Sequence, residues 1–312
     1  MDGGRGIMRL WTVLLICLSV LFSGMNFVAA DDAPVIRLSY NALPFNLPSI
    51  IEREQGFLAA EGYEARYYTF QIGHAMTEAM TAGDLDVAPV MGATSAIVSK
   101  AGGRDIQVIG CYSQAPKAFG LAVRPGTLSL DELSGAVIAV PIGTEAHVLL
   151  GKILAEQGLT FQDVVLANLL IPDGVAALQG GQVDASMVVE PVMSRLEAAG
   201  KIQVIRDGRG LIGGLTLSVV AEHLVGSGLV QAFCRAHAKS TAYLTENFDK
   251  VLDLAAAELN LPLPLVKGMA SKYSFQSEIT DEVRAELVRI IDFLYEERII
   301  RRRITLEELL AP

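Results

Sequence analysis

Charge is scarce in this chain, and basic charge is scarcest. Only 19% of the 312 residues are charged, and 25 Lys and Arg side chains stand against 35 Asp and Glu side chains, for a formal net charge of -10. The longest basic run is Arg301 to Arg303, which we expect at a solvated helix end or on a strap packed against the fold. Because clustered Lys and Arg hold a phosphate backbone, this balance argues against a nucleic-acid partner.

Cysteine is nearly absent. Three cysteines are too few for a disulfide framework, and no CxxC pair is present for zinc or redox chemistry. Cys17 falls in the N-terminal segment, and Cys111 and Cys234 each have apolar residues nearby in the sequence. One bridge between these two is possible, and two buried free thiols are the interpretation that we favour.

The local signatures of several enzyme classes are also missing. The chain has no GxSxG, HExxH or GxxxxGKS/T motif, so the usual sequence evidence for a hydrolase, a metalloprotease or a P-loop site is lacking. Its four histidines are scattered, and no two are four residues apart. We therefore expect a protein that is not an enzyme, with no catalytic residues, no metal site and no cofactor.

The N-terminus has the order of a secretory signal. Arg5 and Arg9 precede an apolar run from Leu10 to Phe22, and small residues follow up to Ala30. We expect a signal peptide over residues 1–30, cleavage after Ala30, and export across the inner membrane to the periplasm. An uncleaved anchor is the alternative, but the apolar run is shorter than the roughly 20 residues of a membrane span.

The rest of the chain is long enough for two cores, since single cores stop growing at roughly 250 to 300 residues. Short β-rich runs alternate with helical patterns, which is typical of an α/β fold with parallel sheets. A helix is expected over Thr144–Gln157, and the pattern after Ala221 is helical, with a last apolar stripe from Val283 to Leu294. The expected strands are Val35–Tyr40, Ala65–Phe70, Leu85–Val90, Ile106–Cys111, Ala118–Val123, Ala136–Val140, Val164–Leu170, Ala185–Val189 and Ile202–Ile205.

One internal similarity organises these elements. MTAGDLDVAPV, from Met80, resembles LQGGQVDASMV, from Leu178, as a helix end, a glycine turn and a strand opened by Asp. Such turns recur in many parallel α/β proteins, but two similar lobes explain the pattern better.

We therefore predict a first lobe over residues 33–123, a second over 126–218, and completion of the first by 221–312. Crossing segments are expected near Pro125 and Gly126 and near Leu217 to Ala221.

A glycine followed by hydroxyl residues opens two of the predicted helices. Gly92 to Ser95 follows one strand, and Gly143 with Thr144 follows another. A helix N-terminus offers free N–H groups to a polar or anionic ligand, although Thr144 and Ser95 are also ordinary N-cap residues. Both turns follow strand ends, where ligands of open α/β sheets bind.

Several segments of the chain together resemble a known protein family. The chain is similar, over nearly all of its length after the signal, to substrate-binding proteins of ABC importers, in the branch that binds aliphatic sulfonates, taurine and nitrate. The segments that carry the resemblance are LSYNALPFNLP, EQGFLAAEG, EAMTAGDLDVA, GTEAHVLLGKILAEQGLTFQDV, GGQVDASMVVEP and FLYEERIIRRRITLEEL. The resemblance implies a two-lobed type II periplasmic-binding-protein fold, each lobe a mixed, mostly parallel sheet flanked by helices.

The resemblance also implies a ligand site between the lobes, with an importer permease and its ATPase as partners and the binding protein as a monomer. The ligand-binding residues implied are Tyr40, Asn41, Phe45, Gly92, Ala93, Thr94, Lys117, Gly143, Thr144, Glu145, His147 and Glu190. Several of these residues also have a purely structural interpretation. Tyr40 and Phe45 would be core aromatics, Lys117 a surface charge, and Glu190 an acid placed at a helix N-terminus.

The sequence departs from the sulfonate-binding pattern at the second of these turns. Several hydroxyl residues are usual there, whereas only Thr144 is kept before Glu145 and Ala146. A carboxylate at Glu145 or Glu190 would repel a sulfonate, so a zwitterion such as taurine or a neutral heterocycle is tolerated better. The alternatives left open are a binder of a thiamine-precursor pyrimidine and a secreted enzyme of the same fold, for which Ser113 and His147 would be the nucleophile and base.

Overall fold

Strands and helices alternate along the part of the chain that the computed structural model describes, residues 33–40 and 46–312. The expected signal at 1–30 and its alternatives lie outside these residues. The elements up to the first crossing are β1 (Val35–Ser39), α2 (Leu47–Gln55), α3 (Phe57–Ala60), β2 (Glu64–Tyr68), α4 (Gly73–Ala82), β3 (Val87–Gly92), α5 (Ala93–Ala101) and β4 (Ile106–Gln114).

The following elements repeat the alternation and then become mainly helical, but the strands Leu215–Ala221 and Ser274–Phe275 are not among the expected strands, and the second of them interrupts the helices. Next come β5 (Phe119–Val123), β6 (Val137–Ala139), α6 (Glu145–Glu156), β7 (Val165–Ala167), α7 (Ile171–Gln179), β8 (Ala185–Val189), α8 (Val192–Ala198) and β9 (Gln203–Asp207). The chain ends with β10 (Leu215–Ala221), α9 (Gly228–Glu246), α10 (Phe248–Leu259), α11 (Leu263–Ala270), β11 (Ser274–Phe275), α12 (Asp281–Glu296) and α13 (Leu306–Leu309).

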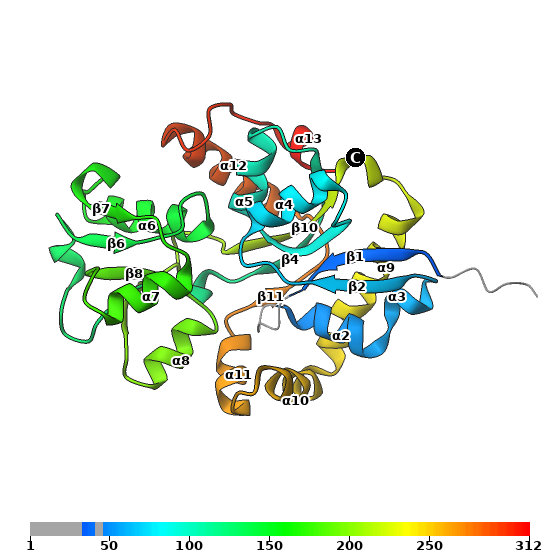
Figure 1. Ribbon diagram of the computed structural model, residues 1–312, viewed down its shortest axis with the longest axis horizontal. Helices are drawn as coiled ribbons and strands as arrows, with labels where there is room; N and C mark the ends of the chain where they lie inside the picture. The colour runs from blue at the N-terminus through cyan, green and yellow to red at the C-terminus, as the bar shows by residue number, and fades with distance from the viewer. Residues whose placement is uncertain (1–32, 41–45) are drawn as a thin grey trace, which may run out of the picture. The chain divides into compact units, whose positions relative to one another are not determined.

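Two mixed sheets form from these strands, flanked by helices (Figure 1). The strand orders are β11-β4-β10-β3-β1-β2 and β7-β6-β8-β5-β9. In each sheet three strands pair in parallel, β2-β1-β3 and β7-β6-β8, and the next strand, β10 or β5, runs antiparallel to them. The two-sheet α/β fold is as predicted, and antiparallel pairs make up more of it than the alternation alone suggests.

The internal similarity is a true structural repeat. Asp86 and Asp184 each open the third parallel strand, and each accepts a 2.8 Å hydrogen bond from a backbone N–H on the neighbouring strand, of Arg37 and Val137 respectively. The preceding turns each place a glycine, Gly83 or Gly181, at positive φ. The two sheets therefore repeat one unit in which a carboxylate fixes the register of adjacent parallel strands.

The segments that pass between the sheets lie elsewhere than the sequence suggests. The strand at Phe119–Val123 was expected at the end of the first lobe, but it pairs with β8 and β9 of the second sheet. The chain therefore changes sheet between β4 and β5, over residues 115–118, and returns between β9 and β10, over 208–214. These two stretches are called the crossing segments below.

The return segment also contains a misleading spacing. Gly208, Gly210 and Gly213 match the GxGxxG pattern of dinucleotide-binding loops. Such a loop joins a strand to a helix, whereas here it joins β9 to β10, so the spacing indicates no nucleotide site.

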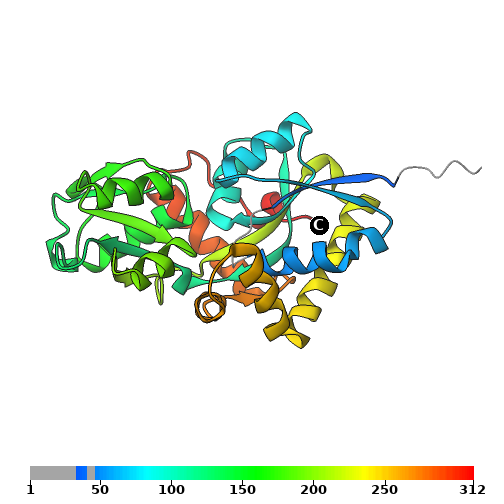
Figure 2. The same cartoon turned by 60° about the horizontal axis from the view of Figure 1, so that its bottom comes forward.

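A hydrophobic core continues from one sheet to the other through α5, α6 and α12. Helix α12 lies between the two sets of elements, drawn orange-red between cyan and green in Figure 2. Its buried positions include Val283, Leu287, Ile290, Ile291 and Leu294, the stripe that its helical periodicity predicts.

The membrane, cysteine and basic-run predictions each have a counterpart in the described residues. No helix within residues 33–40 and 46–312 is long and apolar enough to cross a bilayer. Cys111 and Cys234 are both free, and Cys234 is exposed rather than buried as expected. Arg302 and Arg303 follow α12 and pair with Glu308 and Asp292 on the surface, in agreement with a solvated segment.

Candidate functional site

A cleft of about 670 Å³ lies where the strand ends of both sheets meet. Its lining includes the residues after β2, β3, β7 and β8, the start of α6, and both crossing segments at Ala115 and Gly214. Ligands of α/β sheets bind at this edge, and the volume falls within the usual range for small-molecule sites.

The walls of the cleft are mainly apolar. Phe70, Met76 and Met91 come from the elements of the first sheet, and Phe119 and Ile171 from those of the second. Among the described residues that line the cleft, none is Lys, Arg or His. The ionisable ones are Glu145, Glu190 and Tyr273.

Helix N-termini supply the positive potential that basic side chains do not. The first turns of α4, α5, α6, α7 and α8 all contribute lining residues. At α4 and α5 no side chain caps the helix and no acid lies in the first turn. The first backbone N–H groups of these two helices are therefore available to a ligand. Gly73 and Ser95 lie close together here, since a Cβ on Gly73 would stand 2.7 Å from that of Ser95.

Glu145 connects the helices of the two sheets. It is the first residue of α6, is 3% exposed, and its Oε2 accepts a hydrogen bond of 2.5 Å from Thr94 Oγ1, in the first turn of α5. Its Oε1 is buried without a partner among the described residues. The pKa of Glu145 is raised to about 7, mainly by burial and also by the nearby Glu286, while the Thr94 hydrogen bond, Lys152 and the backbone N–H of Gly214 act against the rise.

Glu190 is fully buried but well compensated. Its carboxylate accepts hydrogen bonds from Ser194 N at 3.2 Å and from Ser194 Oγ at 2.6 Å, and it forms an ion pair with Lys272. Lys272 precedes β11, which belongs to the first sheet, whereas Glu190 follows β8 of the second. The ion pair therefore joins the two sides next to Tyr273 in the cleft wall.

Four of the predicted ligand residues line the cleft: Gly92, Thr144, Glu145 and Glu190. Thr144 occupies the N-cap position of α6, but its hydroxyl donates to Pro141 O at 2.7 Å instead of capping the helix. Ser95, the other expected cap, is the third residue of α5 and lines the cleft.

The other predicted residues that the structure describes lie outside the lining. Ala93 and Thr94 are buried behind it, Lys117 is exposed, and Gly143 donates its N–H to Nδ1 of His147. His147 packs on Phe161 with ring centroids 4.7 Å apart, and burial lowers its pKa to about 4, so it is a neutral core histidine.

Tyr40 also has a structural environment. Its hydroxyl donates to Glu258 in α10, the Arg53 guanidinium lies over its ring at 4.9 Å, and burial raises its pKa. Asn41 and Phe45 lie outside the described residues. The ligand role of all twelve residues stays a prediction.

Many residues that line the cleft were not predicted from the sequence. Thr69 to Gly73 follows β2 and Leu170 to Pro172 follows β7, so the strand-end rule applied to every predicted strand would have found both. Tyr273 had no such signal, because it reaches the cleft from the connection between α11 and β11.

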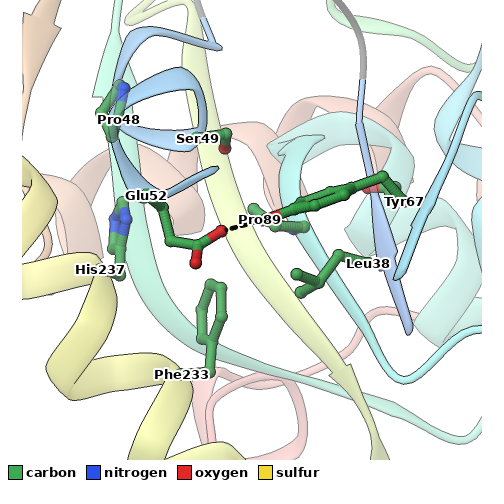
Figure 3. A pocket seen from close by; sticks show the side chains of 9 residues that line it. Leu38, Pro48, Ser49, Glu52, Tyr67, Pro89, Phe233 and His237 are labelled. Carbon is green, nitrogen blue, oxygen red and sulfur yellow. Dashed lines mark hydrogen bonds between the residues drawn. The ribbon is translucent and has the colours of Figure 1, made fainter. Parts of the chain in front are cut away.

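A second cavity, shown in Figure 3, is too small for a solute. It measures about 10 Å³, the space of one water molecule, between Glu52, Phe233 and His237. Glu52 accepts a 2.5 Å hydrogen bond from the Tyr67 hydroxyl there. This cavity is part of the core of the first sheet.

The candidate nucleophile and base are not joined. Ser113 Oγ shares a 2.7 Å hydrogen bond with Thr216 Oγ1, and His147 is turned toward Gly143. No hydrogen bond between Ser113 and His147 occurs in the described part of the chain, and neither residue lines the cleft.

Comparisons with known proteins agree with this geometry. The family model of the NMT1-like family matches residues 29–247. An Escherichia coli (strain K12) protein named for aliphatic sulfonate binding is 24% identical over 306 residues, 95% of either chain. The taurine-binding periplasmic protein of the same organism is 26% identical over 170 residues, 54% of this chain and 53% of the relative.

Solved structures share the fold. The alkanesulfonate-binding protein SsuA from Xanthomonas axonopodis pv. citri, bound to MOPS, superposes with a TM-score of 0.78 at 22% identity, covering 89% of this chain and 98% of its own. The desulfurization enzyme DSZB superposes with a TM-score of 0.65 at 20% identity, covering 89% and 96%. The same fold thus occurs in binding proteins and in an enzyme.

Proposed function

The chain belongs to the NMT1-like family, and from that premise we propose that it is the solute-binding component of an ABC importer, which captures a small organic solute between its two sheets. The observation that supports this most directly is the cleft of about 670 Å³, lined from both sheets and crossed by both connecting segments. A site divided between two halves can close on a solute and reopen.

The chemistry of the cleft favours a binder over an enzyme. Its walls combine apolar side chains with neutral donors such as Ser95 and Gln71. No Cys or His is among the described residues that line it, and the two lining carboxyls, Glu145 and Glu190, are bonded to Thr94 and to Ser194 and Lys272 rather than to a hydroxyl of the lining.

Aliphatic sulfonates and taurine are the first candidates for the solute, because two relatives are named for them. Nitrate and a pyrimidine-type heterocycle are further candidates that the resemblance implies. We propose one lobe built on each sheet, a monomer in the periplasm after cleavage near Ala30, and a permease with its ATPase as partners.

A solute panel tests the proposed function. The mature chain is mixed with taurine, 1-hexanesulfonate, benzenesulfonate, nitrate and an aminopyrimidine in phosphate buffer, because MES, MOPS and HEPES are themselves sulfonates. A true ligand at a hundred times its Kd adds about 2.7 kcal/mol of stability. At roughly 2–4 °C per kcal/mol, the melting temperature should rise by about 5–10 °C.

Ser95→Trp provides the check on the site, since the indole would fill the cleft, and Ser271→Trp at an exposed serine is its control. Binding should be lost in the first variant and kept in the second. A panel without any stabilising solute, or release of a product during incubation, would count against the proposal.

A further inference from the structure

Glu145 lies at the helix N-termini whose positive potential would attract an anionic head group. It belongs to the first turn of α6 and is hydrogen bonded to the first turn of α5, so its carboxyl stands between two helix N-termini. The described lining has no basic side chain, and these helix ends are its main source of positive potential. A charged carboxylate at Glu145 therefore competes with an anion for the same field.

The charged groups near Glu145 are bonded elsewhere and offset the burial of its carboxyl only in part. Glu286 of α12 accepts the N–H of Gly213 at 2.8 Å and pairs with Arg289. Lys152, further along α6, donates to Leu211 O at 2.9 Å. The other acid in the cleft wall, Glu190, pairs with Lys272.

Each of these groups is engaged with a partner of its own, whereas Glu145 has a hydrogen bond from Thr94 on Oε2 and none of normal geometry among the described residues on Oε1. The backbone N–H of Gly214 also favours the ionised carboxyl, but less than burial opposes it. A buried carboxyl with an oxygen lacking a partner favours its neutral form.

We propose that Glu145 is protonated whenever the cleft holds an anionic head group, so that capture of a sulfonate-type solute takes up one proton wherever the free carboxyl is ionised. The inference rests on the proposed function and names Glu145 as the residue that sets its charge selectivity. Charge repulsion acts strongly in a cleft with a low dielectric constant, so the anion and the ionised carboxylate exclude each other. By linkage, protonation must strengthen anion binding as much as the anion strengthens protonation.

The expected pH range follows from the position of the carboxyl. Burial raises the pKa of Glu145 to about 7, so the free protein carries the proton below that pH and loses it above. Sulfonate affinity should be nearly constant in acid and should fall by up to about tenfold per pH unit above neutrality, the slope of one linked proton.

Calorimetric titration of 1-hexanesulfonate into the mature chain, between pH 5.5 and 8.5 in phosphate and Tris buffers, tests the inference. The wild-type Kd should rise about fivefold between pH 7 and pH 8, because half of the carboxyl groups are already ionised at pH 7. Glu145→Gln should bind at every pH with the acid-limit affinity, within about threefold. Glu156→Gln removes a charge at the far end of the same helix, on an exposed residue paired with Arg206, and should titrate like the wild type.

The outcomes separate the inference from the proposed function. The same pH slope in Glu145→Gln as in the wild type, or tighter wild-type binding as the pH rises, would overturn the proton linkage and leave a solute-binding protein. Failure of the sulfonate to bind at any pH would also overturn it. Failure of every solute in the panel would overturn the proposed function as well.

Discussion

Glu190 and Lys272 form an ion pair at the edge of the cleft, with the carboxylate fully buried and the lysine side chain 22% exposed. An exposed pair contributes little to stability, but a buried carboxylate that loses its cation is left with an unpaid desolvation cost. Removing the lysine should therefore lower the free energy of unfolding by more than the attraction between the two charges contributes to it.

We predict that Lys272→Met destabilises the protein by about 3–5 kcal/mol, the usual cost of breaking a buried pair from one side. Lys267→Met is the matched control, because Lys267 and its partner Asp249 are both largely exposed, and it should cost under about 1 kcal/mol. Urea unfolding at neutral pH measures both. Equal, small losses would mean that water reaches Glu190 in solution.

The crossing segments pack backbone against backbone. Gly214 has φ +57°, and a Cβ placed on it would lie 2.5 Å from the carbonyl carbon and oxygen of Ala115. The N–H of Ala115 in turn donates to Gly213 O and Gly214 O. This close approach, on the floor of the cleft, requires glycine at position 214.

Gly214→Ala should therefore destabilise the protein more than Gly210→Ala does. Both glycines have positive φ, but a Cβ on Gly210 meets nothing within 4 Å. The Gly210 variant should cost about 1–2 kcal/mol from backbone strain alone, and the Gly214 variant a further 1–3 kcal/mol or so from steric overlap. Denaturant unfolding measures both free energies. Equal losses in the two variants would show that the crossing segments can move apart to accept a Cβ at position 214.

The two sheets share one continuous core through α5, α6 and α12, and two side-chain contacts, Thr94 with Glu145 and Glu190 with Lys272, join their flanking elements. Strands β5 and β10 are held within the sheets, so we expect any closing motion to turn about the short crossing segments at 115–118 and 208–214.

We predict that the solute which raises the melting temperature most also lowers the radius of gyration, because ligand-driven closure brings the two proposed lobes together. X-ray scattering with and without that solute measures the change. The Ser95→Trp variant, with its cleft filled, should give the same profile in both conditions. An unchanged wild-type profile at saturation would indicate a rigid site.

The local pattern of the chain determined its elements and its repeat. The apolar stripe of α12 and the turns before Asp86 and Asp184 were predicted because helical periodicity, glycine at positive φ and strand alternation are local properties. The two-lobed α/β fold followed from them and from the family resemblance, as did a site at the strand ends.

Partners distant in sequence were decided only by the tertiary structure. Nothing in the apolar run Phe119–Val123 encodes which sheet it joins, because any strand edge with free backbone groups can form its hydrogen bonds. The packing of the folded chain places it between β8 and β9. Likewise, His147 and Glu145 lie two residues apart in one helix turn, yet one faces Phe161 in the core and the other meets Thr94 beside the cleft. Both residues were candidates from the sequence, and only the direction of each side chain in the folded chain separates a core histidine from a buried carboxyl that joins α6 to α5.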